Sequence, residues 1–261
     1  MTILKHELKQ NRISFLIWTA VISFMIGVCV FIYPEMKGEM ESVSQVFGDM
    51  GSFSAAFGMD QINFGTLLGY YSIECGNVLG LGGAFFAALC GAGILAKEEK
   101  DHTAEFLLTH PIGRVKIITQ KLIAVLSQVI VLNVIVFVVV VFSMLVIGEK
   151  IPWNEMILLH VSYLLMQLEL AGICFGISAF LRRGSLGIGL GVAVTMYFLN
   201  LISNITESAE FLKYITPFAY ANGSDIVTKV ALDTKLIILG LIYAIVGIIL
   251  AYIKYSKKDI V

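Results

Sequence analysis

Residues 122–147 read LIAVLSQVIVLNVIVFVVVVFSMLVI, an uncharged run that decides the class of fold. The run exceeds the roughly 20 residues that a helix needs to cross a bilayer, and only Ser127, Gln128, Asn133 and Ser143 interrupt it. Its many β-branched residues lower the preference for a helix in water. In hydrocarbon, however, each backbone N–H and C=O needs a partner, which a helix provides within the run. The run therefore predicts a transmembrane helix.

The composition extends this expectation to the whole chain. Hydrophobic residues make up 58% and charged residues 14%, which excludes an ordinary soluble domain. A net charge of -1 gives no electrostatic footprint for nucleic acid, so we expect no nucleic-acid partner. The stretches between apolar runs are too short to build a separate globular core. We expect an all-α membrane protein with a single transmembrane domain, residues 1–261.

Five further apolar runs accompany the first one, and together they predict six spans at residues 13–33, 73–96, 122–147, 156–181, 185–203 and 235–253. Residues 1–12 put apolar and basic side chains on largely opposite sides of a helix: Ile3, Leu4 and Leu8 against Lys5, Lys9 and Arg12. This pattern predicts an amphipathic helix at an anionic membrane surface. The run at residues 13–33 lacks a convincing small-residue cleavage site, so we expect it to be retained as the first span rather than removed as a signal peptide.

The distribution of basic residues predicts the orientation. Six spans put both termini on one side, together with segments 97–121 and 182–183. Lys and Arg number three in residues 1–12, five in 97–121, two in 182–183 and three in the C-terminal tail. The opposite side holds five, in segments 34–72, 148–155 and 204–235. The positive-inside rule therefore places both termini in the cytoplasm.

Residues 97–114, KEEKDHTAEFLLTHPIGR, form the longest charged break in the first two thirds of the chain. Thr103 and Phe106 fall on one face of a helix that Pro111 ends. A helix of about two turns is not stable alone in water, so its order depends on what it touches. The consecutive apolar residues 106–108 favour a protein partner over the alternative, a solvated loop between two spans.

This segment resembles the cytoplasmic coupling helix of ABC-2 type exporter permeases. In that family an acidic pair precedes a base, a Gly-Thr, a Glu, paired leucines, a proline and a base. The matching residues here are Glu98, Glu99, Lys100, Thr103, Glu105, Leu107, Leu108, Pro111 and Arg114, with His102 in place of the usual glycine. The end of the fourth span (178–183), the dip at 214–218 and the closing Lys258-Asp259 are also similar to the family. The long first outer loop resembles the bacterial subgroup that exports ions, peptides and lantibiotics.

The resemblance implies the permease subunit of an ATP-binding-cassette exporter in a bacterial plasma membrane. No GxxxxGK[ST] motif occurs in the chain, so ATP and Mg²⁺ would act on a separate ATPase subunit. The implied complex has two ATPase subunits and a second permease, either a copy of this chain or a different one. Its substrate path would be lined by spans one, two and five. The few polar groups within the spans favour an amphipathic, peptide- or lipid-like cargo over a small ion.

Residue roles follow from the same resemblance. Docking to the ATPase is expected for Glu98, Glu99, Thr103, Glu105, Phe106, Leu107, Leu108, Pro111 and Arg114. Apolar anchors 106–108 would be buried in the ATPase, while the charged residues would set the register.

Glu169 and Gln167 lie near the middle of the fourth span, where an ionisable group costs a few kcal/mol. One interpretation is a carboxylate that contacts substrate or protons. The other is a neutral, hydrogen-bonded glutamate that locks helix packing through Gln128 or Asn133. Both remain open at this point.

Two other functions compete. A proton-coupled secondary transporter would use Glu169 as its proton site, but the inverted repeat that would favour it is not evident. An intramembrane enzyme could use His160 with Glu169, but nine residues of helix separate them by about two and a half turns. We predict no catalytic residue or metal site in this chain. The four cysteines (Cys29, Cys75, Cys90 and Cys174) have no metal-ligand spacing and are interpreted as small core residues.

Overall fold

The computed structural model describes residues 2–97, 113–181 and 186–257, and these form helices without any strand. Six helical spans are long and apolar enough to cross a membrane, so the prediction of a six-span, all-α membrane protein is confirmed. They are α1 (Thr2–Asp49), the continuous α3–η2–α4 (Leu67–Cys75, Gly76–Leu81 and Gly82–Gly93), α7 (Arg114–Val146), α8 (Trp153–Ser178), α9 (Leu186–Ile205) and α11 (Thr234–Lys257).

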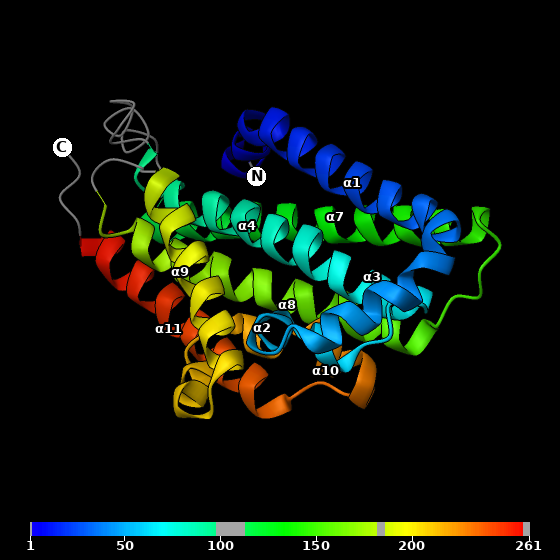
Figure 1. Ribbon diagram of the computed structural model, residues 1–261. Coiled ribbons are helices and arrows are strands. Elements are labelled where there is room, and N and C mark those ends of the chain that lie inside the picture. Colours follow the sequence, from blue (N-terminus) through cyan, green and yellow to red (C-terminus); the bar gives the residue numbers. More distant parts are fainter. Residues whose placement is uncertain (1, 98–112, 182–185, 258–261) are drawn as a thin grey trace.

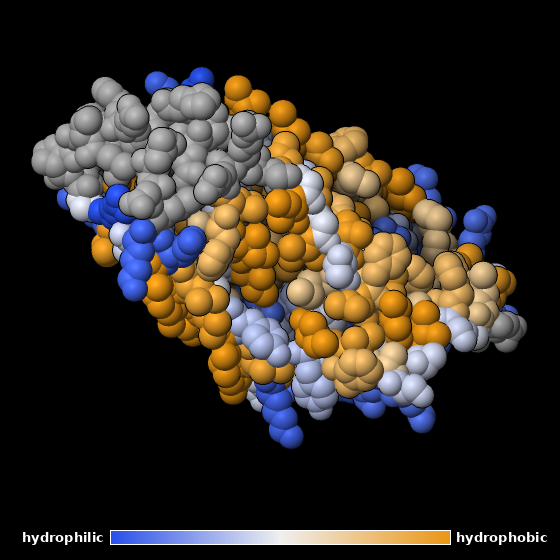
Figure 2. All heavy atoms as spheres, turned by 90° about the vertical axis from the view of Figure 1, so that its left-hand side faces the viewer, coloured by the Kyte–Doolittle hydropathy of each residue, from blue (hydrophilic) through white to orange (hydrophobic). Residues whose placement is uncertain are grey.

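Short elements connect the spans at one end of the bundle. They are α2 (Ser52–Phe57), η1 (Met59–Gln61), η3 (Glu207–Tyr214), η4 (Pro217–Ala219) and α10 (Gly223–Lys229). At the other end lie the beginnings of α1, α7 and α9 and the ends of α4, α8 and α11 (Figure 1). Hydrophobic residues cover most of the central surface on the side seen in Figure 2, and hydrophilic ones stand mainly at its margins. This distribution suits a protein surrounded by lipid.

Helix α8 is the centre of the bundle. In its most apolar window 61% of the residues are buried, against 17% in α9 and in α11. It packs on α4 and on α11, while α1 packs mainly along α7. Glycines permit the α8–α11 contact, because a Cβ at Gly176 would lie 2.7 Å from the carbonyl oxygen of Gly247. Such close backbone approach is typical of membrane helices.

The π-helical turn η2 interrupts the second span. The spacing of Gly76 and Gly80 in the sequence predicts that this turn admits the backbone of another helix. The structure corrects this expectation, because both glycines face the side chain of Tyr163 on α8. A Cβ at either position would lie 3.1 Å from the tyrosine, at its hydroxyl oxygen and at ring atom Cε1 respectively. The glycines thus make room for a buried aromatic ring.

Helix α1 does not end where the sequence predicted. Residues from Pro34 onward were expected to form an outer loop, but the helix continues through Pro34 to Asp49. A proline inside a helix removes one backbone hydrogen bond and costs about 3 kcal/mol. Tertiary contacts on both sides of Pro34 offset this cost. The Tyr33 hydroxyl donates to the Gly65 carbonyl at 2.8 Å, and Lys37 pairs with Glu149 at 3.3 Å.

The α8–α11 contact generates the first prediction. Replacing Gly176 by Ala should destabilise the bundle by about 1–3 kcal/mol, because the added methyl overpacks the contact with Gly247. Gly191→Ala is the matched control on α9, where a Cβ would meet no atom within 4 Å. The control should be neutral or slightly stabilising, since alanine favours a helix. Thermal melting of the purified chain in neutral detergent measures both, and equal melting temperatures would contradict the packing account.

Candidate functional site

A buried ion cluster, formed by Glu7, Lys97 and Lys121, joins three segments at the end of the bundle where α1 begins. The ammonium of Lys121 lies 2.7 Å from Glu7 Oε1 and donates to the Ile94 carbonyl at 2.9 Å. The ammonium of Lys97 lies 3.6 Å from Glu7 Oε2. Glu7 is 1% exposed and Lys121 is fully buried. The cluster therefore ties α1 to α7 and to the residues that follow α4.

Local sequence explains how Glu7 reaches this position. Ile3 and Glu7 are one helical turn apart on the same face of α1, and both are buried against α7. The backbone N–H of Leu4 also donates to Gln120 Oε1 at 3.2 Å. Sequence analysis assigned the buried side of this segment to apolar residues and missed the carboxylate. The available signal was a single glutamate one turn after Ile3 in an otherwise basic segment.

Arg114 begins α7 and was predicted to dock the ATPase. Its guanidinium donates to the carbonyls of Tyr255 and Ser256, at 3.4 and 3.2 Å. These carbonyls belong to the last turn of α11, where backbone acceptors lack helical partners and a positive charge is favourable. The structure thus places Arg114 against α11. The remaining predicted docking residues, 98–111, lie outside the described part of the chain.

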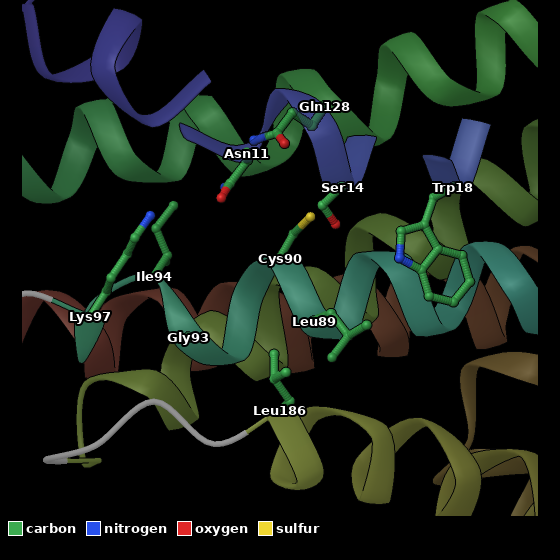
Figure 3. A pocket seen from close by; sticks show the side chains of 10 residues that line it. All are labelled: Asn11, Ser14, Trp18, Leu89, Cys90, Gly93, Ile94, Lys97, Gln128 and Leu186. Atoms are coloured by element: carbon green, nitrogen blue, oxygen red, sulfur yellow. The ribbon is translucent and has the colours of Figure 1, made fainter. Parts of the chain in front are cut away.

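A cavity of about 500 Å³ lies beside the ion cluster. Helix α1 contributes Asn11, Ser14 and Trp18 to its wall, and α4 contributes residues from Leu89 to Gly93. Figure 3 shows the α1 and α4 side chains on the two sides of a gap, with Leu186 of α9 below α4. The first, second and fifth spans therefore line this cavity together with the third, which contributes Gln128. Three of these four spans are those that the family resemblance implies for the substrate path.

The polar groups of the cavity wall are few. Lys97 is the only charged residue that lines it within the described ranges. Gln128 of α7 is 5% exposed and donates through Nε2 to the Ala124 carbonyl at 3.0 Å. Its Oε1 atom has no hydrogen-bond partner among the described residues. A buried acceptor without a partner is costly, so this atom is suited to a ligand that donates a hydrogen bond.

Gln167 and Asn133 are brought together deeper in the bundle. Asn133 Nδ2 donates to Gln167 Oε1 at 2.7 Å, and Gln167 Nε2 donates to the Leu79 carbonyl at 3.0 Å. Both side chains are buried, and neither lines the cavity. The chain of hydrogen bonds links α7, α8 and η2. Such a network holds helices in register in an apolar medium.

Glu169 is 1% exposed, and its partner is neither Gln128 nor Asn133, which corrects our expectation. The hydroxyl of Tyr220 donates to Glu169 Oε2 at 2.7 Å. Tyr220 follows η4 in the segment between α9 and α11, so the bond fastens this segment to α8. Gly240 of α11 leaves space for the carboxyl group, because a Cβ there would overlap it. We infer a packing role for Glu169.

The ion cluster generates a stability prediction. Glu7→Met or Lys121→Met alone should cost about 3–5 kcal/mol, because each leaves a buried charge with one partner fewer. The double variant should recover most of this loss, since apolar side chains of similar volume then replace the pair. Thermal melting in neutral detergent would reveal the recovery, and Lys5→Met on the exposed side of α1 is the control. Losses that simply add in the double variant would contradict a buried pair.

The Glu169–Tyr220 bond predicts a contrast between two variants. Tyr220→Phe removes the donor and strands a buried acceptor, which should cost about 1–3 kcal/mol. Glu169→Gln keeps an acceptor for Tyr220 and should change stability by less. If packing is the role of Glu169, transport by the Gln variant should keep its dependence on pH. A transport profile that loses its pH dependence would instead identify Glu169 as a proton site.

The described residues contain no cluster of His, Cys, Asp and Glu that could hold a metal ion.

Comparison with known proteins identifies the family of the chain. A search of curated protein sequences finds no significant match. A sequence-family profile described as "ABC-2 family transporter protein" matches residues 1–260. Permeases of this family are the membrane components of ABC transporters, in which another subunit carries the ATPase. The chain therefore belongs to the ABC-2 transporter family.

Proposed function

We propose that this chain is the permease half of an ABC exporter in a bacterial plasma membrane, and that it moves an amphipathic substrate by alternating access. The observation that carries the proposal is the cavity between the first, second, third and fifth spans. It adjoins the ion cluster from which residues 98–112 depart. Substrate would enter this cavity, and an ATPase subunit bound to residues 98–114 would drive its release on the opposite side.

Contacts at both ends of the docking segment support this coupling. Lys97 precedes the segment and pairs with Glu7 of α1. Arg114 is the last residue of the segment and binds the last turn of α11. A force applied to the segment by ATP-driven closure would therefore reach the first and the last span together. Because α1 also forms a wall of the cavity, displacement of α1 would change the shape of the substrate site.

The charge distribution of the described residues supports a cytoplasmic location for this end. Lys5, Lys9, Lys116 and Lys254 lie near the helix ends that meet there. At the opposite end acidic residues dominate, including Glu35, Glu149, Glu207 and Asp233. This asymmetry agrees with the positive-inside rule and with both termini in the cytoplasm.

The complete exporter would contain a second permease and two ATPase subunits. The most apolar windows of α9 and α11 are the least buried, at 17% each, so these helices have surface to offer to lipid or to another permease. Large apolar side chains such as Phe198 and Ile245 are exposed there. In the proposed complex the two permeases would enclose the substrate path between them.

Leu107→Asp tests the docking segment. A charge in place of a buried apolar anchor should lower ATPase recovery at least about tenfold, because losing such an anchor costs about 2 kcal/mol or more. Insertion into the membrane should be unaffected. Co-expression with the ATPase subunit and affinity purification of the permease would measure the ratio of the two chains.

The matched control is Phe211→Asp, which places the same charge on an exposed apolar residue at the opposite end of the bundle. This control should retain the ATPase at the level of the unmodified chain. Normal ATPase recovery with Leu107→Asp would reject residues 98–114 as the docking segment.

A further inference from the structure

The cavity beside the ion cluster is polar at one end and apolar at the other. Lys97 and Asn11 stand at one end and Trp18 at the other, as Figure 3 shows, with Ser14 and Gln128 between them. Lys97 lies eight positions after Leu89, and α4 ends between them at Gly93. At the rise of an α-helix this separation corresponds to about 12 Å. The wall therefore changes from charged to aromatic over a length comparable to that of a lipid head group together with the first part of an acyl chain.

The charge at the polar end favours an anion. The ion cluster contains one carboxylate and two ammonium groups. Lys121 is the closer partner of Glu7, at 2.7 Å against 3.6 Å for Lys97. The Lys97 side chain is 21% exposed, whereas that of Lys121 is fully buried. Lys97 can therefore face a ligand while Lys121 holds the glutamate. Within the described ranges, the residues that line the cavity include Lys97 and no carboxylate.

The acceptor at Gln128 adds a second requirement. Its Nε2 is committed to the Ala124 carbonyl, which settles the orientation of the amide and leaves Oε1 without a partner in the described part of the chain. Gln128 is nineteen-twentieths buried and belongs to the cavity wall. Oε1 is itself covered, so a rotation of the side chain would bring it to a hydroxyl group on the ligand, whereas an acyl chain would offer it no donor. The ligand therefore needs a hydrogen-bond donor close to its anionic group.

From these features we propose that the cavity binds a lipid-like amphiphile whose head group combines an anionic phosphate with a hydroxyl. The phosphate pairs with Lys97, and the hydroxyl donates to Gln128. The first part of the acyl chain lies against Trp18, Leu89 and Leu186. This assignment rests on the proposed function, in which the same cavity admits substrate, and it narrows the substrate class.

Trp18 provides a direct reporter of occupancy. The chain has two tryptophans, and the other one, Trp153, begins α8 at the opposite end of the bundle. In a Trp153→Phe background, fluorescence therefore reports on Trp18 alone. The full-length chain in neutral detergent would be titrated with phosphatidylglycerol that carries brominated acyl chains, which quench nearby tryptophan. Phosphatidylcholine with the same chains tests charge. Phosphatidylethanol with the same chains, an anionic phosphodiester whose head group has no hydroxyl, tests the hydroxyl.

The expected order of half-saturating concentrations, from lowest to highest, is phosphatidylglycerol, then phosphatidylethanol, then phosphatidylcholine, with about a tenfold difference between the first and the last. Lys97→Met should raise the value for phosphatidylglycerol toward that for phosphatidylcholine, whereas Lys97→Arg should preserve it. Gln128→Leu should abolish the advantage of phosphatidylglycerol over phosphatidylethanol. The control is Lys116→Met, which changes an exposed lysine near the start of α7. It should change neither the half-saturating concentration of phosphatidylglycerol nor the advantage of this lipid over the one without a hydroxyl.

Equal quenching by all three lipids would overturn the proposal, and so would an anionic preference that survives in Lys97→Met. Inorganic phosphate should not relieve the quenching, and relief at millimolar concentration would show a site for a free anion instead. Copurification of the ATPase with the same preparations tests the proposed function separately from the ligand assignment. If the ATPase copurifies but lipid selectivity is absent, the proposed function stands and only the ligand assignment fails.

Discussion

Lipid hydrocarbon offers no hydrogen-bond partner, and this constraint organises the whole bundle. The backbone satisfies it by forming helices, and polar side chains satisfy it by pairing between helices. Such pairs include Glu7 with Lys121, Asn133 with Gln167, and Tyr220 with Glu169. Each pair joins segments far apart in the chain, so the polar groups that are expensive to bury also specify which helices meet.

The cavity lies where α1 faces α4, beside the ion cluster. Helix α1 packs mainly along α7, whereas α4 packs on α8 and α9, and α8 also holds α11. The ion cluster joins α1 to the residues after α4, because Glu7 belongs to α1 and Lys97 follows α4. A motion of α1 against α4 would therefore change the ion cluster and the cavity together.

The spans could be predicted from the sequence because a long apolar run has one stable conformation in lipid. The continuation of α1 past Pro34 could not, because contacts with residues 32 and 112 positions away along the chain support it. The partner of Glu7 lies 114 residues away, and that of Glu169 lies 51 residues away in a connecting segment. Apolar periodicity reveals which faces are buried, but it does not show which polar groups face each other. Gln128 was recognised as a candidate, yet its place in the cavity wall depended on how four helices meet.

The central claim is that this chain operates as the membrane part of an ATP-driven complex. Purification from the native membrane in mild detergent, followed by mass spectrometry of the intact complex, tests it most directly. The account predicts an ATPase subunit at about one copy per permease, within an assembly of two permeases. An intact assembly that contains the permease without any ATPase subunit would contradict it.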